Sequence, residues 1–264
     1  MTPISLENRA VLAVAGPDAA AFLQGLITHD VGLLAVGRSL YAGLLSPQGK
    51  ALFDFHLHAG EDGTILIDVA ADKAGALLKR LSIYKLRKAV TLARRDDLAV
   101  LASWPSDSLG GEPADARTPA LGARWIGTAG SAPADAEAYD AHRLAVGVPD
   151  SADIGSDELL WLETGADLLD GVSFTKGCYV GQENTARMHH RDKVRRRLVP
   201  VAIAGDPGET VEVKDEAGRS CGKLRSRRGD HGFVHLRLEE ADKSLFLGDA
   251  EVTVRRPDWL AGAW

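Results

Sequence analysis

The hydrophobic positions in the first part of the chain follow two spacings. An apolar run at residues 11–15 predicts a β-strand. Phe22, Leu23 and Leu26 then recur at the spacing of one helix face, which predicts a helix over residues 17–25. This pairing of a strand with a short helix indicates a domain that mixes both kinds of element.

A hairpin is predicted over residues 41–59, because two strand-like runs lie on either side of Ser46–Gly49, whose proline and glycine favour a tight turn. Alternate residues of its second strand fall on two faces: Phe53, Phe55 and Leu57 on one, and Asp54, His56 and His58 on the other. The second set has the residue types of a metal site. A polar sheet surface is the commoner explanation, and the pattern alone leaves both open.

The remaining pattern up to residue 150 is also mixed. It predicts strands at 64–70, on both sides of Arg94–Asp97 and at 123–127. It predicts an amphipathic helix over 71–88 and a second helix that ends near Gly147. The inward residues of the first of these helices are Leu77, Leu78, Leu81 and Tyr84. The order shows no regular βαβ rhythm, which favours an α+β fold over a doubly wound sheet.

After Arg197 the pattern changes to short strands separated by Gly, Asp and Glu turns, which predicts a small β-barrel or sandwich. Residues 105–119 are rich in Pro, Gly, Ser, Asp and Ala and read as a loop. We therefore expect two regions, residues 1–194 with interleaved α+β parts and residues 195–264 with the barrel.

Composition excludes several classes of protein. The chain has 264 residues, of which 45% are hydrophobic and 26% charged, as in a soluble globular protein. Its net charge of −6 argues against a nucleic-acid binder, and no apolar run approaches the ~20 residues that span a bilayer. Glu7 stands where a signal peptide is basic, and the two cysteines suit free thiols in a reducing compartment, so a cytoplasmic location is expected.

One stretch is basic in spite of the acidic whole. Residues 187–197 hold six Lys or Arg against one acid, Asp192, with His189 and His190 between them. Such a patch predicts an anionic ligand or an acidic partner. A merely solvated surface is an equally good explanation.

Cys178 is the strongest candidate for chemistry. Gly177 and Gly181 allow tight or positive-φ backbone, and Lys176 and the basic run favour the thiolate form of a nearby cysteine. A buried cysteine that fills a small space is the alternative. Glycines, lysine, Gln182 and Glu183 are poor company for a core residue, so a displayed thiol is the better interpretation.

The residues around Cys178 do not complete a site. A nucleophile needs a base, and nothing in the pattern places His189 or His190 beside the thiol. An iron–sulfur cluster takes about four donors. The other cysteine, Cys221, stands alone in a turn and reads as structural. The chain is therefore expected to supply one thiolate, at Cys178, to a cluster shared with a partner.

The segment from Ser173 to Arg187, "SFTKGCYVGQENTAR", resembles the signature of the YgfZ-type folate-binding proteins of iron–sulfur cluster maturation. These proteins are relatives of the T-protein, the aminomethyltransferase of the glycine cleavage system. The following "TARMHHR" is similar to the branch shared with mitochondrial homologues. Residues 16–31, 41–55 and 84–90 are also similar to family segments, in family order.

The resemblance implies a T-protein-like α+β fold, with two mixed subdomains and a C-terminal antiparallel β-barrel around a central cavity. It implies that the protein binds tetrahydrofolate and acts late in building four-iron clusters on client iron–sulfur enzymes. An A-type iron–sulfur carrier protein is the implied partner. Cys178 matches the family's essential cysteine, and the resemblance assigns no enzymatic reaction.

Folate chemistry suggests further site residues. The polar edge of a pterin is bound by a carboxylate or amide, and its flat face packs against an aromatic side chain. The anionic glutamate tail of a folate is bound by cations. The candidates by chemical type are Gln182, Glu183 and Glu163 for the edge, Tyr84 or Tyr179 for the wall, and Lys176, Arg187 or Arg191 for the anionic parts. Glu163 lies in "LETG", which resembles a T-protein "LEAG" segment.

Two other functions compete with the maturation factor. One is a tetrahydrofolate-dependent aminomethyl or one-carbon transferase like the T-protein, which does not need a cysteine in this loop. The other is a cysteine hydrolase, which needs a histidine within hydrogen-bond reach of the thiol. The glycine setting of Cys178 favours the maturation factor over both.

Overall fold

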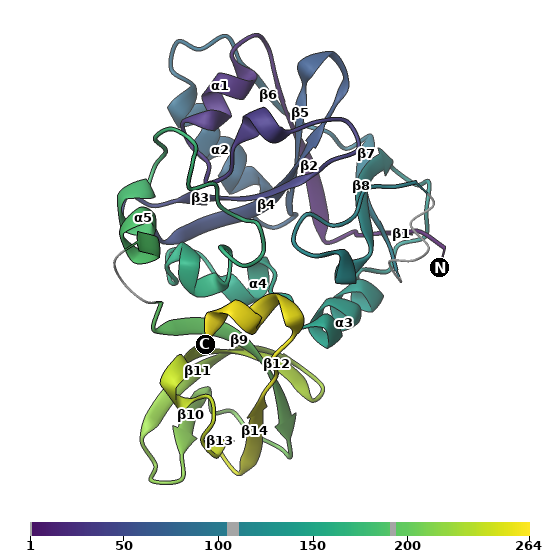
Figure 1. The fold of residues 1–264 in the computed structure, drawn as a ribbon. Coiled ribbons are helices and arrows are strands. Elements are labelled where there is room, and N and C mark those ends of the chain that lie inside the picture. Colours follow the sequence, from purple (N-terminus) through teal and green to yellow (C-terminus); the bar gives the residue numbers. More distant parts are fainter. Residues whose placement is uncertain (1, 105–110, 191–193) are drawn as a thin grey trace.

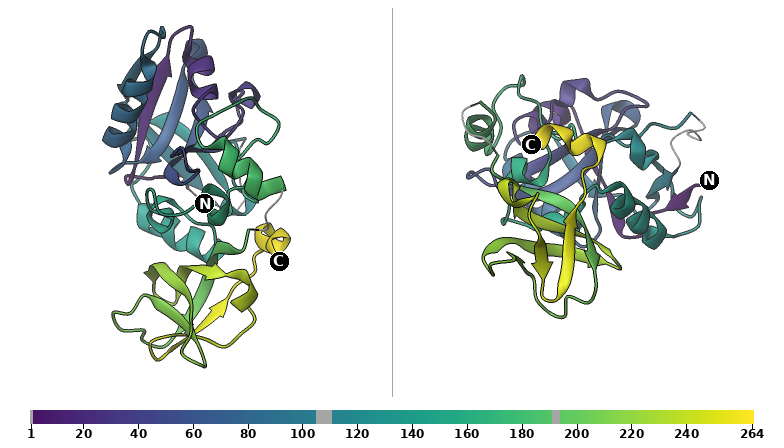
Figure 2. Two further views of the ribbon diagram at one scale, coloured as in Figure 1. Left: turned by 90° about the vertical axis from the view of Figure 1, so that its left-hand side faces the viewer. Right: turned by 60° about the horizontal axis from the view of Figure 1, so that its bottom comes forward.

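The structure is a computed structural model that describes residues 2–104, 111–190 and 194–264. Its sheets are a five-stranded sheet, a three-stranded sheet and a closed barrel (Figure 1). In Figure 2 the barrel lies at the end of the molecule away from the five-stranded sheet, with the helical segments of the middle of the chain between them.

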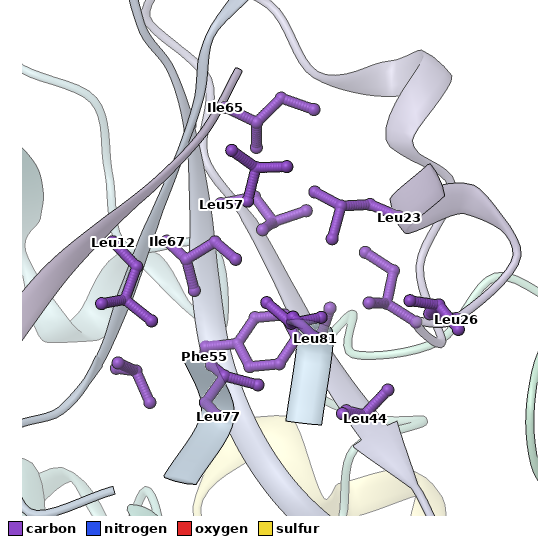
Figure 3. Close-up of a cluster of buried hydrophobic side chains, with 14 of the residues drawn as sticks. Leu12, Leu23, Leu26, Leu44, Phe55, Leu57, Ile65, Ile67, Leu77 and Leu81 are labelled. Atoms are coloured by element: carbon purple, nitrogen blue, oxygen red, sulfur yellow. The ribbon is translucent and has the colours of Figure 1, made fainter. Parts of the chain in front are cut away.

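The five-stranded sheet forms the N-terminal part and is antiparallel, with the order β3-β4-β5-β2-β6. Its elements, in chain order, are β2 (Arg9–Ala15), α1 (Ala19–Gln24), η1 (Val31–Leu33), β3 (Leu40–Leu45), β4 (Ala51–Ala59), η2 (Glu61–Gly63), β5 (Ile65–Ala70), α2 (Ala74–Lys85) and β6 (Thr91–Arg94). Leu23 of α1 and Leu77 and Leu81 of α2 pack with Phe55 in one apolar core (Figure 3). Phe22 of α1 belongs to the same core. This burial is what holds both helices on the sheet.

The three-stranded sheet, with the order β1-β7-β8, lies beside the first and is followed by the helices of the middle of the chain. These elements are β1 (Ile4–Ser5), β7 (Leu98–Ser103), η4 (Pro119–Leu121), β8 (Ala123–Thr128), α3 (Ala136–Val146), α4 (Ser151–Ile154), η5 (Trp161–Thr164) and α5 (Gln182–His190). Gly147 ends α3 in the left-handed conformation, as expected for a helix that stops at glycine.

The C-terminal strands close into a barrel with the order β10-β11-β12-β9-β14-β13. Its elements are β9 (Arg196–Ala204), β10 (Glu212–Asp215), β11 (Ser220–Arg228), β12 (His231–Arg237), η6 (Leu238–Glu240), β13 (Leu245–Leu247), β14 (Ala250–Val254) and η7 (Asp258–Ala263). Valines and leucines of alternate strand positions fill its interior, for example Val199, Val201 and Val213. The predicted α+β fold with a C-terminal antiparallel barrel is thus confirmed.

The predicted strands on both sides of Arg94–Asp97 are present as β6 and β7. They belong to different sheets, because β6 joins the five-stranded sheet and β7 the three-stranded one. Strand β13 and helix α5 were missed, since the first is only 3 residues long and the second carries Thr185 as its only buried side chain. None of the described helices is long and apolar enough to cross a membrane.

The polar face of β4 is not a solvated surface. Asp54, His56 and His58 are all buried, and Asp54 accepts a hydrogen bond of 2.5 Å from the Ser151 hydroxyl in α4. Residues from the middle of the chain pack over this face, and strand alternation cannot predict such a tertiary contact. Alternation predicted which residues share a face but not what covers them.

Candidate functional site

Cys178 lies in the irregular segment that precedes α5, and its side chain is exposed with a free thiol. The next residue, Tyr179, is 8% exposed and packs in the core cluster around Trp161. Burial raises the pKa of the Tyr179 hydroxyl to about 12, so it stays neutral. A buried neighbour therefore fixes the backbone while the thiol points outward.

Lys176 anchors the same segment from below. Its Nζ donates to the backbone carbonyls of Gln24 (2.7 Å), Ile27 (2.7 Å) and His29 (3.0 Å), at the end of α1 and just beyond it. These bonds use all three donors of an ammonium group, and burial lowers the pKa of Lys176 to about 8. These bonds give Lys176 an anchoring role that the sequence did not indicate, and its action on the thiolate or on a folate stays a prediction.

Gly181, on the C-terminal side of Cys178, packs closely against the hairpin turn. Its φ is +82°, and a Cβ there would lie 2.5 Å from the carbonyl oxygen of Ser46 in the hairpin turn. Asn184 Nδ2 donates to the carbonyl of Gln48 in the same turn at 2.6 Å. Gly177 differs from the prediction, because its φ is not positive and a Cβ there would meet open space.

Helix α5 carries three of the predicted residues. Glu183 is exposed in the first turn, Gln182 is half-buried, and exposed Arg187 donates to Asn184 Oδ1 at 3.0 Å. The helix that carries them starts four positions after Cys178 in the chain. Arg191, the alternative cation for a folate tail, lies outside the described residues.

The two histidines of α5 are engaged elsewhere. The His189 ring stacks on Phe174, with 3.6 Å between centroids and 13° between planes, and His190 lies edge-on to His189 at 4.8 Å. Within the part of the chain that the structure describes, neither makes a hydrogen bond to Cys178. These two histidines therefore do not supply the base that a cysteine hydrolase needs.

Two predicted folate residues lie away from Cys178. Tyr84 is on α2 and packs against the core of the five-stranded sheet. Glu163 caps its own short helix, with Oε2 accepting from the Leu160 N–H at 3.1 Å, and lies 3.5 Å from His235 Nε2 in the barrel. The described contacts of Tyr84 and Glu163 are thus separate packing and capping contacts, and the folate site stays a prediction.

A second polar centre, which the sequence did not reveal as such, lies behind β4. Asp68 is fully buried and binds Arg9 Nε (2.6 Å) and Arg124 Nε (2.7 Å). Burial raises the pKa of Asp68, but the two arginines outweigh it and hold that pKa below its usual value. Since Arg9, Asp68 and Arg124 come from β2, β5 and β8, the cluster ties the two sheets together.

Not every polar atom of this centre has a partner. His58 Nε2 and Arg124 Nη2 are buried and make no hydrogen bond to any described residue. Burial lowers the pKa of His58 to about 3, so the ring is neutral. His58 also lines a hollow of about 670 Å³ together with Arg38, Glu112 and Trp125. Unpaired buried donors and acceptors beside a hollow are typical of a place where water or a ligand binds.

Metal-ligand geometry occurs at another place. Among the described residues, the clustered set is Asp215, Cys221 and Glu240, with ligand atoms within 4.8 Å of one another. Each acid already has a cation, Arg219 for Asp215 and Lys243 for Glu240. Cys221 is buried, and burial raises the pKa of its thiol. These contacts suit a structural cysteine, as the sequence indicated.

The sequence is similar to proteins of iron–sulfur cluster assembly. Residues 195–262 match the family described as the C-terminal β-barrel domain of CAF17. The chain is 34% identical to the mitochondrial iron–sulfur cluster assembly factor IBA57 of Mus musculus, over 98% of this chain and 85% of that protein. It is 33% identical to the IBA57 protein of Homo sapiens, over 96% of this chain and 84% of that protein.

Among solved structures, the chain is similar to the glycine cleavage system aminomethyltransferase T from Bartonella henselae, with a TM-score of 0.74. The match covers 96% of this chain and 84% of that one at 14% identity. It confirms the T-protein-like fold and says nothing about activity. The prediction of a cytoplasmic location is wrong by these comparisons, because the relatives named above are mitochondrial proteins.

Proposed function

Since the chain belongs to the family of the iron–sulfur cluster assembly factor IBA57, we propose that it serves iron–sulfur cluster assembly through the thiol of Cys178. The observation that carries the proposal is an exposed cysteine on a segment fixed at three points, by Lys176, Tyr179 and Gly181. A rigid support matters because a ligand that is already in place loses little conformational freedom on binding.

In this proposal Cys178 contributes one ligand to the iron–sulfur cluster. Cys178 gives its thiol proton to solvent, and its sulfur binds an iron of the cluster at a position that the partner leaves to water or a small thiol. A cluster needs about four protein donors. Among the described residues Cys178 is the exposed cysteine and Cys221 the buried one, so the other donors come from the partner. The cluster is cargo that passes through the site.

The partner in this proposal is an A-type carrier protein, which hands four-iron clusters on to client enzymes. The surface around Cys178 supports such a contact, since Glu183, Arg187 and His189 of α5 are exposed beside it. Helix α5 itself is clamped to the hairpin turn by Asn184. A charged, ordered rim around one reactive thiol suits a transient protein–protein contact better than an enzyme cleft.

Reduced folate is a separate part of the proposal. The residues expected to bind it do not lie together, so we derive no step through a folate at Cys178. The hollow at His58 has the chemistry a folate needs: Trp125 as a flat wall, Glu112 for ring N–H groups, and Arg38 for the anionic tail. The unpaired Nε2 of His58, which lines the hollow, is available for the polar edge.

The ligand proposal has a direct test. Calorimetry with tetrahydrofolate is expected to show binding to the wild type, and at least tenfold weaker binding to Arg38→Ala (about 1.4 kcal/mol). Glu163→Gln, away from the hollow, serves as the control and should bind normally. No heat with the wild type would remove the folate proposal, and equal weakening in both variants would move it away from this hollow.

The cluster proposal is tested with the two cysteines as a matched pair. Wild type, Cys178→Ser and Cys221→Ser are mixed with an A-type carrier, iron and sulfide, and the shared cluster is followed by its visible absorbance. Cys178→Ser is expected to keep its fold by circular dichroism but to form no shared cluster, whereas Cys221→Ser forms it. A full shared cluster on Cys178→Ser would refute the proposed function.

A further inference from the structure

A second basic surface lies on α2 and the loop that follows it. Residues 73–90 hold six Lys or Arg and no acid, in a chain whose net charge is −6. Lys73 donates to the backbone carbonyls of Ser151 and Gly155, so its ammonium group stabilises the fold. The other five cations form what we call the basic knob: Lys79, Arg80, Lys85, Arg87 and Lys88.

The cations of the basic knob have no acidic partners. Over the three described stretches of chain, none of them forms an ion pair. The arginines a few residues further along the chain do form ion pairs: Arg94 with Asp96 at 2.7 Å and Arg95 with Asp97 at 2.6 Å. Five unpaired like charges repel one another, and an acidic partner that covers them would relieve this repulsion.

Two large aliphatic side chains are displayed among these cations. Ile83 is 60% exposed and Leu86 is 87% exposed. Leu86 also has a φ of +46°, whereas the other described non-glycine residues with positive φ are aspartates, which tolerate it better. Strain of this kind costs energy and persists where the surrounding structure enforces it, often at functional surfaces.

The surrounding structure does enforce it. The Ala89 N–H donates to Asp18 Oδ2 at 2.7 Å, and the Lys88 N–H donates to the Lys85 carbonyl at 2.9 Å. Leu86 and the neighbouring side chains line a hollow of about 650 Å³ with Asp18 and Tyr84. The knob is therefore an ordered element with an apolar tip, a hollow beside it and a basic rim.

We infer that the basic knob docks an acidic, partly apolar surface of the iron–sulfur carrier whose cluster Cys178 shares; this rests on the proposed function. Helix α1 connects the two places. Asp18, at its start, holds the knob, and Gln24, at its end, accepts from Lys176 two residues before Cys178. Six residues of helix span only about 9 Å.

One partner can cover both places, because a standard interface buries about 800 Å² on each protein. An anionic membrane also attracts cations beside exposed leucine. The arrangement favours a protein, because α2 buries its own apolar face in the core through Leu77 and Leu81, and because a hollow receives a side chain from a shaped partner. Lipid binding is kept as an outcome of the test.

The test measures binding of a purified A-type carrier to the full chain by calorimetry. Charges of the knob are reversed in the triple variant Lys85→Glu, Arg87→Glu, Lys88→Glu. The matched control reverses three exposed cations of the barrel: Lys214→Glu, Lys223→Glu, Arg237→Glu. The knob variant is expected to weaken binding by about tenfold or more, and the control by less than about threefold. Raising salt from about 0.05 M to about 0.3 M should weaken the wild type as well.

A second variant separates docking from folding. Leu86→Gly removes both the displayed side chain and the backbone strain, so it is expected to unfold at the same or a higher temperature while binding the carrier at least about fivefold more weakly. A purely structural role for Leu86 would leave binding unchanged, and that result would overturn the inference.

The outcomes are distinct from those of the proposed function. If Cys178→Ser still docks but forms no shared cluster, and the knob variant does not dock, both hold. If the knob variant docks normally while Cys178→Ser forms no shared cluster, only the docking inference fails. No binding by the wild type, or knob-dependent binding to vesicles of anionic lipid without an effect on the carrier, also overturns it.

Discussion

Exchanging Gly181 for alanine is the sharpest perturbation of the Cys178 segment. The new Cβ would lie 2.5 Å from the Ser46 carbonyl oxygen and 2.9 Å from Leu45 Cβ, at a φ of +82°. Alanine in this region costs about 1–2 kcal/mol, and overpacking adds about 1–3 kcal/mol. We therefore expect Gly181→Ala to lower the free energy of unfolding by about 2–5 kcal/mol.

Gly177→Ala is the matched control, because it makes the same change on the other side of Cys178, where a Cβ meets nothing within 4 Å. Its free energy of unfolding should stay within about 0.5 kcal/mol of the wild type. Urea unfolding followed by tryptophan fluorescence measures both variants, and cluster sharing with the carrier is measured beside it. Equal stability of the two variants would refute the argument that Gly181 is locked against the hairpin turn.

Two further predictions concern buried titratable side chains. Lys176→Met leaves the carbonyls of Gln24, Ile27 and His29 without this donor, and should cost about 2–4 kcal/mol in urea unfolding; an unchanged midpoint would contradict the anchoring role. The pKa of His58 is lowered to about 3, so the unfolded chain takes up the proton first, and stability is lost as pH falls from about 6.5 toward 3. His58→Leu should flatten that loss by up to about 1.4 kcal/mol per pH unit; parallel stability–pH curves would show that His58 does not titrate this way.

Much of the fold was predictable because it rests on short-range pattern. The hairpin around Ser46–Gly49, helix α2 and the barrel strands follow from alternation, helical spacing and turn residues. Strand β13 was missed because 3 residues carry too little pattern. Helix α5 was missed because its sequence is polar almost throughout, so no apolar face announced it.

The candidate site divides in the same way. Composition and motif identified Cys178, and its exposure agrees with the poor core company of its neighbours. The anchoring role of Lys176 was not predicted, because sequence proximity to a thiol does not say which groups a long side chain contacts. Only the fold brings the carbonyls of residues 24, 27 and 29 to its ammonium group. The contacts of Tyr84 and Glu163 likewise depend on how the chain folds in space, which their positions in the sequence do not show.

By itself the sequence determined the kinds of element, the solitary thiol and the family resemblance, since each depends on residues close together along the chain. The tertiary structure alone decided what covers each face. It buried Asp54, His56 and His58, with Ser151 of α4 bonded to Asp54, and it left the cations of α2 without acidic partners among the described residues. The reason is physical: burial and ion pairing depend on which distant segments meet, and local spacing carries no record of those meetings.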